Sequence, residues 1–450
     1  MFPSHDRRNF FFSLVIAGAL GSVLTASVLR AASESKDTYE ELETFASIMA
    51  IVQRHYVDEV PSKDLVQGAI KGMVASLDPH SSYLTPEGYK ELQIETHGEF
   101  GGLGIELTVR DSLLTIVTPI DGTPAYRAGI KPGDQIIKID DDMTMDMPLQ
   151  GAVEKMRGKP GSKVRLSLKR KGVSNLIDVD LIREVIHIRS VRGEQLLDNR
   201  WAYLRLTGFQ DGSGKELVAA LDKLDKKKKG GVEGIILDLR YNPGGLLTQA
   251  VEISDLFLDA GLIVRVNGRM ESQTTSYFAE EKGTRRMVPM IVMVNEGSAS
   301  ASEIVAGAVQ DHRRGLILGV KSFGKGSVQT ILPLGEDTAL RLTTARYYTP
   351  SGRSIHEHGI DPDVVVEALK FDPEAKKDET LRSRDDLDLA NDPQLRKAIE
   401  LMGTWKGDVI KIGGVAGFDV PKPTAEARAA AAAPAAGETA AAKAAAEAAR

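Results

Sequence analysis

The chain has 450 residues, enough for about two to four domains with sizeable cores. Hydrophobic residues make up 42% and charged residues 27%, a balance typical of globular rather than disordered proteins. A formal net charge of −6 without a long basic stripe argues against nucleic-acid binding, and the absence of cysteine excludes disulfides, thiol catalysis and zinc–thiolate sites.

The N-terminus predicts export. Arg7 and Arg8 precede an apolar stretch of about 20 residues that runs to about Leu29, with small residues such as Ala31 near its end. This pattern is typical of a secretory signal, and the arginine pair resembles the twin-arginine variant. The stretch is also long enough to span a bilayer if it is retained. Residues 1–32 are therefore a cleaved signal peptide or a membrane anchor, and we expect an extracytoplasmic protein, in the bacterial periplasm.

Residues 38–95 are predicted to form an N-terminal helical region. Leu42, Phe45 and Ile48 recur at helical spacing, and Ser62 is the expected N-cap of a second helix. The region has too few apolar residues for a core of its own. We expect it to pack on the body of the protein or on a second copy of the chain.

A compact module of short strands and two helices is predicted at 98–172. Its order and residues resemble a PDZ domain, in the motifs Gly102-Leu103-Gly104-Ile105 and Ala128–Asp134 and in the helix near Val153. The resemblance implies that backbone N–H groups around Leu103, Gly104 and Ile105 bind the C-terminal carboxylate of a peptide, which adds as a strand to the module. A glycine turn without a ligand is the simpler alternative.

The segment 173–370 alternates strands with helices. The expected strands are 234–239, 262–266, 288–294 and 315–319, and the expected helices are 214–224, 246–258 and 300–309. Such alternation favours an α/β architecture with a partly parallel sheet.

Two C-terminal segments follow this core. The first, 371–423, opens with a charged stretch that is expected to be loop or short helix. The second, 424–450, is mostly alanine and lacks the large apolar side chains of a core. It is therefore predicted to be a low-complexity tail that is disordered or transiently helical.

A run of small residues and hydroxyls, Gly297–Glu303, follows one expected strand and opens the next helix. A serine at such a turn has an exposed hydroxyl beside the unpaired backbone N–H groups of the helix N-terminus. The hydroxyl can attack a carbonyl and the N–H groups can bind the resulting oxyanion. The alternative is that Ser298, Ser300 or Ser302 only caps the helix.

A serine nucleophile needs a base, and Lys325 is a stronger candidate for this base than any histidine of the chain. It lies between two glycines, 25 positions after Ser300. Lysine is a base near neutrality only if burial lowers its ordinary pKa of about 10.4, and Phe323 is expected to help form a tight, partly apolar loop. Gln329 is expected to orient the amine. The alternatives are a surface lysine and a phosphate-binding loop, whose glycine spacing is absent.

Histidine is the usual base, and spacing alone does not exclude it. His312 lies in the polar run 310–314, which is expected to be a solvated helix end. His80, His356 and His358 lie in loop-like segments and remain open candidates.

Taken together, these motifs resemble the carboxyl-terminal processing proteases, also called tail-specific proteases, over most of residues 40–367. The matching motifs are Leu77–Ser81, the PDZ-like module, Asp238–Gly245, Gly297–Glu303, Phe323–Gln329, Tyr348–Arg353 and Gly359–Asp363. Several long motifs in one order make the resemblance specific. It implies an α/β, crotonase-like protease core with an inserted PDZ-like domain and an N-terminal helical segment.

The resemblance also implies the roles of individual residues. Ser300 would be the nucleophile, Lys325 the general base and Gln329 the residue that positions the lysine. The backbone N–H groups of Gly245 and Ala301 would form the oxyanion hole. The expected activity is that of an exported serine endopeptidase that recognises protein C-termini and needs no metal or organic cofactor.

The expected partners are polypeptide substrates, with a homo-oligomer through the N-terminal helices and an adaptor or regulatory protein also open. Two other functions compete with proteolysis. One is a PDZ scaffold on an inactive hydrolase core, which the intact Ser300, Lys325 and Gln329 argue against. The other is a crotonase-type acyl-CoA enzyme, which the export signal and the PDZ-like module argue against.

Overall fold

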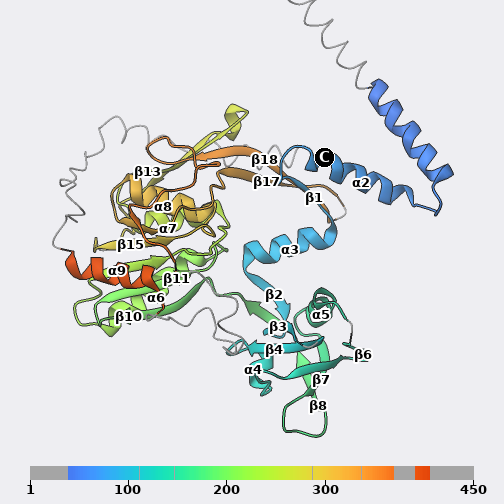
Figure 1. The fold of residues 1–450 in the computed structure, drawn as a ribbon, viewed down its shortest axis with the longest axis horizontal. Helices are drawn as coiled ribbons and strands as arrows, with labels where there is room; N and C mark the ends of the chain where they lie inside the picture. The colour runs from blue at the N-terminus through green and yellow to red at the C-terminus, as the bar shows by residue number, and fades with distance from the viewer. Residues whose placement is uncertain are drawn as a thin grey trace, which may run out of the picture. The chain divides into compact units, whose positions relative to one another are not determined.

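The computed structural model describes residues 39–368, except 111, 146, 286 and 336, together with residues 391–405 (Figure 1). The predicted signal or anchor, the alanine-rich tail and most of the segment 371–423 lie outside the described residues. The chain divides into two compact units, residues 1–83 and 84–450, and each is described by itself.

The first unit is helical where it is described. Residues 39–55 form one helix, and α2 (Ser62–Ala75) forms the next, before β1 (Ser82–Leu84) at the boundary of the units. Ser62 is the first helical residue and Pro61 is the N-cap, so the expected cap lies one position too late. Leu42, Phe45 and Ile48 are exposed. No helix among the described residues is long and apolar enough to cross a membrane.

The second unit opens with α3 (Pro86–His97), which Thr85 caps through its side chain. Next comes a small β-rich module. It is flanked by a separate two-stranded antiparallel sheet of β2 (Glu99–Gly102), which leads into it, and β9 (Glu184–His187), which leads out of it. The chain therefore enters and leaves the module side by side.

The module itself is a five-strand antiparallel path, β3-β4-β5-β7-β8, with β6 paired to β5. Its strands are β3 (Ile105–Arg110), β4 (Leu113–Pro119), β5 (Gln135–Ile139), β6 (Asp142–Met143), β7 (Lys163–Lys169) and β8 (Ile177–Ile182), and its helices are α4 (Pro124–Arg127) and α5 (Leu149–Met156). Alternate residues of the central strands, such as Ile116, Ile136 and Leu166, point to one buried core that does not merge with the core of the rest of the unit.

The rest of the unit is built on a six-stranded sheet of order β10-β11-β12-β15-β16-β19. The strands are β10 (Val191–Leu197), β11 (Trp201–Leu206), β12 (Gly234–Asp238), β15 (Met290–Val294), β16 (Leu316–Gly319) and β19 (Val364–Val365). Only β10 pairs antiparallel, and the other neighbours are parallel. The predicted α/β architecture with a partly parallel sheet is confirmed. Every residue of β12 and β15 is buried, as expected for central parallel strands.

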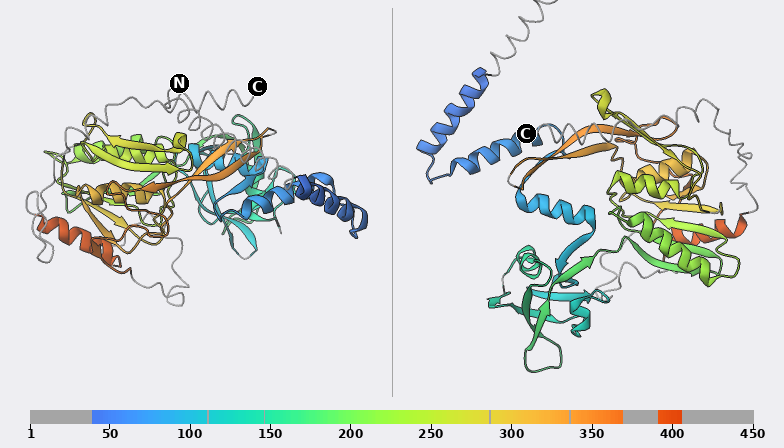
Figure 2. Two further views of the ribbon diagram at one scale, coloured as in Figure 1. Left: turned by 90° about the horizontal axis from the view of Figure 1, so that it is seen from above. Right: turned by 180° about the vertical axis from the view of Figure 1, so that it is seen from behind.

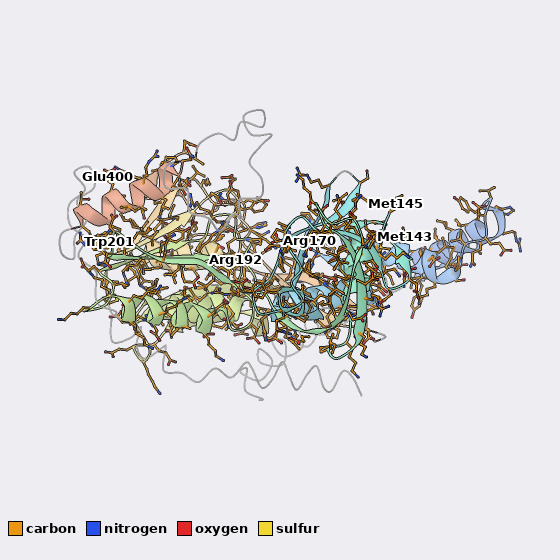
Figure 3. All side chains as sticks on the ribbon, turned by 90° about the horizontal axis from the view of Figure 1, so that it is seen from below. Met143, Met145, Arg170, Arg192, Trp201 and Glu400 are labelled. Carbon is orange, nitrogen blue, oxygen red and sulfur yellow. The ribbon has the colours of Figure 1, made fainter. Side chains whose placement is uncertain are left out.

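Helices cover both faces of this sheet (Figure 2). On one face, α6 (Ser213–Lys227), α7 (Leu247–Asp255) and α8 (Ala301–Asp311) pack on residues such as Leu204 and Val292. On the other face, α9 (Pro393–Thr404) packs on Trp201, and Figure 3 shows α9, which carries Glu400, on the side of the sheet from which Trp201 projects. The sequence did not predict α9.

A second, antiparallel sheet is built from strands that alternate along the chain with those of the first sheet, and it was predicted only in part. Its order is β17-β18-β13-β14, from β13 (Gly261–Gly268), β14 (Thr275–Ala279), β17 (Ser327–Pro333) and β18 (Ala339–Tyr348), with the short 3₁₀ helix η1 (Glu271–Gln273) between β13 and β14. The long ribbon of β17 and β18 was not predicted, although it carries Gln329.

A buried ion-pair network joins α9 to the end of β12. Arg240 donates to Asp238 Oδ2 at 2.7 Å and to Asp392 Oδ2 at 2.7 Å, and Asp392 also caps α9 through Leu395 N. Tyr203 adds a hydrogen bond to Asp238 at 2.8 Å. Burial opposes ionisation of Asp238, but the attraction of Arg240 and these hydrogen bonds outweigh it and hold its pKa below the ordinary value.

Replacement of Arg240 should therefore destabilise the protein strongly. Arg240→Met leaves Asp238 ionised and buried without its counter-charge, so we expect the free energy of unfolding to fall by about 3–5 kcal/mol at neutral pH. Since the ionised form of Asp238 is the one that Arg240 stabilises, the difference should shrink as acid protonates Asp238.

Chemical denaturation of both proteins measures this effect. The matched control is Arg200→Met, which removes an exposed ion pair with Glu233 and a cation–π contact with Trp201, and its loss should be much smaller. Equal losses in the two variants would contradict a special role for Arg240.

Candidate active site

The serine turn lies at the carboxyl end of β15. Ser300 precedes the first residue of α8 and has φ 56° and ψ −112°, a strained conformation for a residue with a side chain. Asn295 fixes the turn, because its Oδ1 accepts hydrogen bonds from Tyr241 N at 2.8 Å and Gly297 N at 3.1 Å. Strain that is held in place by such contacts is a feature of functional sites.

Of the three serines in this run, two are bound to the neighbouring turn. Ser298 Oγ donates to Leu239 O at 2.8 Å, and Ser302 Oγ donates to Asn242 O at 2.9 Å. Both side chains are fully buried. They fasten the serine turn to the segment 239–245, whereas the side chain of Ser300 makes no such bond to that segment.

The segment 239–245 is a glycine turn that packs directly on the serine turn. Gly244 has φ 100°, and a Cβ atom at this position would lie 2.8 Å from Ser300 Cβ and 2.9 Å from Ala301 N. Only glycine fits here, both for space and for backbone conformation. Asn242 orders the turn, since its side chain donates to Leu206 O at 2.7 Å and accepts from Gly244 N at 2.9 Å.

Two backbone amides at this junction are available to a ligand. Ala301 N belongs to the first turn of α8, where amides have no intrahelical acceptor. Around Gly245, Phe209 N donates to Gly244 O and Leu246 N donates to Phe209 O, which leaves Gly245 N out of the pairing. Within the described part of the chain, neither amide donates a hydrogen bond. The structure thus brings Gly245, Ala301 and Ser300 together.

The loop that carries Lys325 connects β16 to β17 and lies on the other side of the serine turn. Glu303, the third residue of α8, accepts hydrogen bonds from Ser300 N at 2.8 Å, Lys325 N at 2.9 Å and Gly324 N at 2.6 Å. Ser322 Oγ donates to the same carboxylate at 2.6 Å. The backbones of Ser300 and Lys325 are therefore both tied to Glu303.

Lys325 is half-buried, and its pKa lies below the ordinary value. The main cause is burial, the second is repulsion by Arg341, and attraction by Glu303 acts in the opposite direction. Phe323 in the same loop is 62% exposed. The loop packs tightly through Gly324 and Gly326 against the backbone of residues 355–359.

Gln329 lies on β17, on the same face of the β17–β18 ribbon as Thr343 and Arg341, because Gln329 pairs with Thr343 and Ile331 with Arg341. Its amide donates to Ser327 Oγ at 2.9 Å and to Thr343 Oγ1 at 3.3 Å. Among the described residues, neither the Ser300 hydroxyl nor the Lys325 amine hydrogen-bonds another side chain. Direct hydrogen bonds of Lys325 with Ser300 or Gln329 are thus not part of this conformation.

The histidines occupy different environments. The run 310–314 is a helix end as predicted, because α8 ends at Asp311 and His312 is its C-cap. It is only partly solvated, since His312 Nε2 contacts Leu262 O at 2.6 Å and Arg314 donates to Phe257 O at 2.8 Å. His356 lies in the segment against Gly326, with Nδ1 buried and without a hydrogen-bond partner in the described structure. His356 is therefore the histidine that an experiment must compare with Lys325.

The module carries a groove of about 180 Å³ between β3 and α5. Its apolar lining includes Leu103, Ile105, Leu149, Val153 and Met156. Gly104 has φ 74°, and within the described structure the amides of Leu103 and Gly104 donate no hydrogen bond. The three residues expected to bind a peptide carboxylate thus line one groove.

Sequence reasoning missed Glu303 and Arg341. Glu303 stands three positions after Ser300, a spacing typical of a capping box, and this pattern could have drawn attention to it. Arg341 had no such signal, because its strand was not predicted. The described residues hold no cluster of three or more His, Asp or Glu side chains that could bind a metal ion.

A mostly parallel α/β core with a serine turn at the carboxyl end of a central strand, joined to a small β-rich module with an apolar groove, fits a serine peptidase with a PDZ domain. Comparison with known proteins gives the same class. Residues 200–366 match Peptidase family S41, residues 101–181 match the PDZ domain, and residues 10–88 match the activating protease CtpB N-terminal domain.

The carboxy-terminal-processing protease of Bartonella bacilliformis is 45% identical over 359 residues, which cover 80% of this chain and 82% of that protein. The carboxy-terminal processing protease CtpA of Bacillus subtilis is 37% identical over 389 residues, covering 84% and 81%. Among solved structures, the photosystem II D1 C-terminal processing protease aligns at 30% identity and a TM-score of 0.41, over 72% of this chain and 92% of that one. The chain belongs to the carboxy-terminal processing proteases of peptidase family S41, and it is a serine-type endopeptidase.

The positive charge of Arg341 predicts how the pKa of Lys325 responds to mutation. Arg341→Gln removes the repulsion that favours the neutral amine, so the pKa of Lys325 should rise, whereas Arg341→Lys should hold it close to the wild-type value. NMR titration of the lysine Cε resonances, assigned with Lys325→Ala, measures this pKa.

Arg265→Gln on β13 is the control, because it removes the same charge from the same sheet and Arg265 is not among the groups that act on Lys325. A Lys325 pKa that is unchanged in Arg341→Gln, or shifted as much in Arg265→Gln, would contradict the assignment.

Proposed function

We propose that this endopeptidase cleaves polypeptides with a Ser300/Lys325 dyad. The observation that carries the proposal is that three features lie together. Ser300 has a strained backbone, and the amides of Gly245 and Ala301 beside it donate no hydrogen bond within the described structure. The loop of the half-buried Lys325 is bound to the same carboxylate as Ser300. A nucleophile, oxyanion donors and a base are the three parts that acyl transfer requires.

In this mechanism Ser300 Oγ attacks the peptide carbonyl carbon while neutral Lys325 Nζ takes the hydroxyl proton. The carbonyl oxygen becomes an oxyanion, to which Gly245 N and Ala301 N donate. The protonated Lys325 then gives its proton to the leaving amine, and the acyl group remains on Ser300 as an ester. A water molecule, deprotonated by Lys325, hydrolyses the ester and restores Ser300.

The lowered pKa of Lys325 supports this assignment, because a larger fraction of the amine is then neutral at a given pH. Gln329 would position the amine once a substrate is bound, and its place on β17, four residues after Lys325 in the chain, supports this role. Apo hydrogen bonds in active sites often tighten only in the complex with substrate.

The groove of the PDZ domain would bind the C-terminal residues of the substrate. The carboxylate would accept hydrogen bonds from the amides around Leu103, Gly104 and Ile105, and the peptide would pair with β3 as an added strand. The apolar lining from Val153 and its neighbours favours substrates that end in apolar side chains.

Further proposals concern the location and assembly of the protein. The sequence of residues 1–32 supports export to an extracytoplasmic compartment, either with signal cleavage or with a retained anchor. The exposed apolar residues of the helix at 39–55 support a homo-oligomer. The helix-covered parallel sheet supports a crotonase-like core, and an adaptor or regulatory protein is a further partner to test.

Cleavage of an unstructured polypeptide tests the dyad. Ser300→Ala and Lys325→Ala should each lower kcat by about 10⁴-fold or more, because the parts of a nucleophile–base pair act as a unit. His356→Gln is the control, since it changes the partly buried histidine beside the loop and should leave activity close to that of the wild type. Equal turnover by the wild type and Lys325→Ala, or loss of activity only in His356→Gln, would contradict the proposal.

Substrates with a free or an amidated C-terminus test the groove. Val153→Asp places a carboxylate where the substrate carboxylate and apolar side chains should bind, so KM for the free-acid substrate should rise about 10-fold or more while kcat changes little. The amidated substrate should not distinguish Val153→Asp from the wild type. Glu154→Ala, on the exposed side of α5, is the control, and an unchanged KM in Val153→Asp would refute binding in this groove.

A further inference from the structure

Glu303 is a fully buried carboxylate whose two oxygens accept four hydrogen bonds. Oε2 accepts from Ser300 N at 2.8 Å and Lys325 N at 2.9 Å. Oε1 accepts from Ser322 Oγ and Gly324 N, both at 2.6 Å. A single oxygen atom is therefore shared by the backbone amides of two residues that stand 25 positions apart in the sequence.

A helix-capping role does not account for this arrangement. A capping box needs only the contact of Glu303 with the backbone N–H of Ser300. The other three donors belong to the loop between β16 and β17, in another part of the sequence. Three of the four hydrogen bonds thus hold the Lys325 loop rather than the helix.

The carboxylate is also suited to this position by its charge state. All four groups that face it are donors, so the ionised form satisfies them all, whereas a protonated carboxyl has one oxygen that must itself donate. Burial acts in the other direction and raises the pKa of Glu303 above its ordinary value, against the hydrogen bonds that lower it. A buried charge with four donors is costly to disturb, since removal leaves several amides without partners.

We propose that Glu303 is a positioning residue that fixes the distance between the Ser300 turn and the Lys325 loop. The proposal rests on the proposed dyad and adds to it. Because Ser300 N and Lys325 N bind the same oxygen, their separation cannot exceed the sum of two hydrogen-bond lengths, and any shift of the loop breaks at least one bond. Glu303 also acts on Lys325 as a charge, and Arg341 from β18 is the other charge that does so.

Glu303→Gln tests the proposal in the full-length protein. In this variant an NH₂ group replaces one carboxylate oxygen and faces two hydrogen-bond donors, so the Lys325 loop should shift. A misplacement of about 1 Å costs about 100-fold in rate, so kcat should fall by about that factor with little change in KM. Loss of the negative charge should also lower the pKa of Lys325, because attraction by Glu303 raises it. The acidic limb of the kcat/KM profile should therefore move to lower pH.

Asp363→Asn is the matched control. Asp363 is another partly buried carboxylate next to α8, where it accepts from Gln310 Nε2 at 3.0 Å and Ile317 N at 2.8 Å, away from the serine turn. The same chemical change there should leave kcat and the pH profile unchanged. If Glu303→Gln does not fold, Ser322→Ala replaces it, because it removes one of the four donors and should lower kcat several-fold with KM unchanged.

Three results would overturn the proposal: wild-type kcat in folded Glu303→Gln, a lower kcat with an unshifted acidic limb, or wild-type kcat in Ser322→Ala when Glu303→Gln is unfolded. The proposed dyad is tested separately in the same assay by Ser300→Ala and Lys325→Ala. If these two variants are inactive and Glu303→Gln is not impaired, only the role of Glu303 fails. If Lys325→Ala keeps full activity, the dyad itself fails.

Discussion

The parallel pairing of β12, β15 and β16 is the constraint on which the site depends. Parallel neighbours end at the same edge of a sheet, so the segments that follow these three strands must emerge side by side. They are the glycine turn 239–245, the serine turn 295–300 and the lysine loop 320–326. The central position of β15 places the serine turn between the glycine turn and the lysine loop. Ser298 and Ser302 fasten the serine turn to the glycine turn, and Glu303 fastens it to the lysine loop.

Much of this arrangement was predictable from the sequence, because it depends on local patterns. The apolar runs at 234–239, 288–294 and 315–319 predicted strands, and the structure has strands there. A run of small residues and hydroxyls after such a strand placed Ser300 at the start of a helix, where the structure also has it. The glycines of the turn at 244–245 were also a reliable signal, since their backbone conformation excludes other residues.

The remaining features depend on contacts between distant segments, which no local pattern encodes. The ribbon of β17 and β18 alternates polar and apolar residues imperfectly and is only partly buried, so it gave a weak signal. Arg341 acts on Lys325 from β18, although the register of the ribbon pairs it with Ile331 and not with the lysine loop. The helix α9 is held by Arg240, which lies 152 positions before Asp392. The lysine loop packs through Gly324 and Gly326 on residues 355–359.

Trapping of the acyl-enzyme tests the central claim most directly. The full-length protein is mixed with an activated ester of a short peptide, the reaction is stopped with acid, and the modified residue is located by mass spectrometry of proteolytic fragments. The account predicts one acyl group, on Ser300, that forms rapidly in the wild type and far more slowly in Lys325→Ala. Acylation of Ser298 or Ser302, or equal rates of acylation in the wild type and Lys325→Ala, would contradict it.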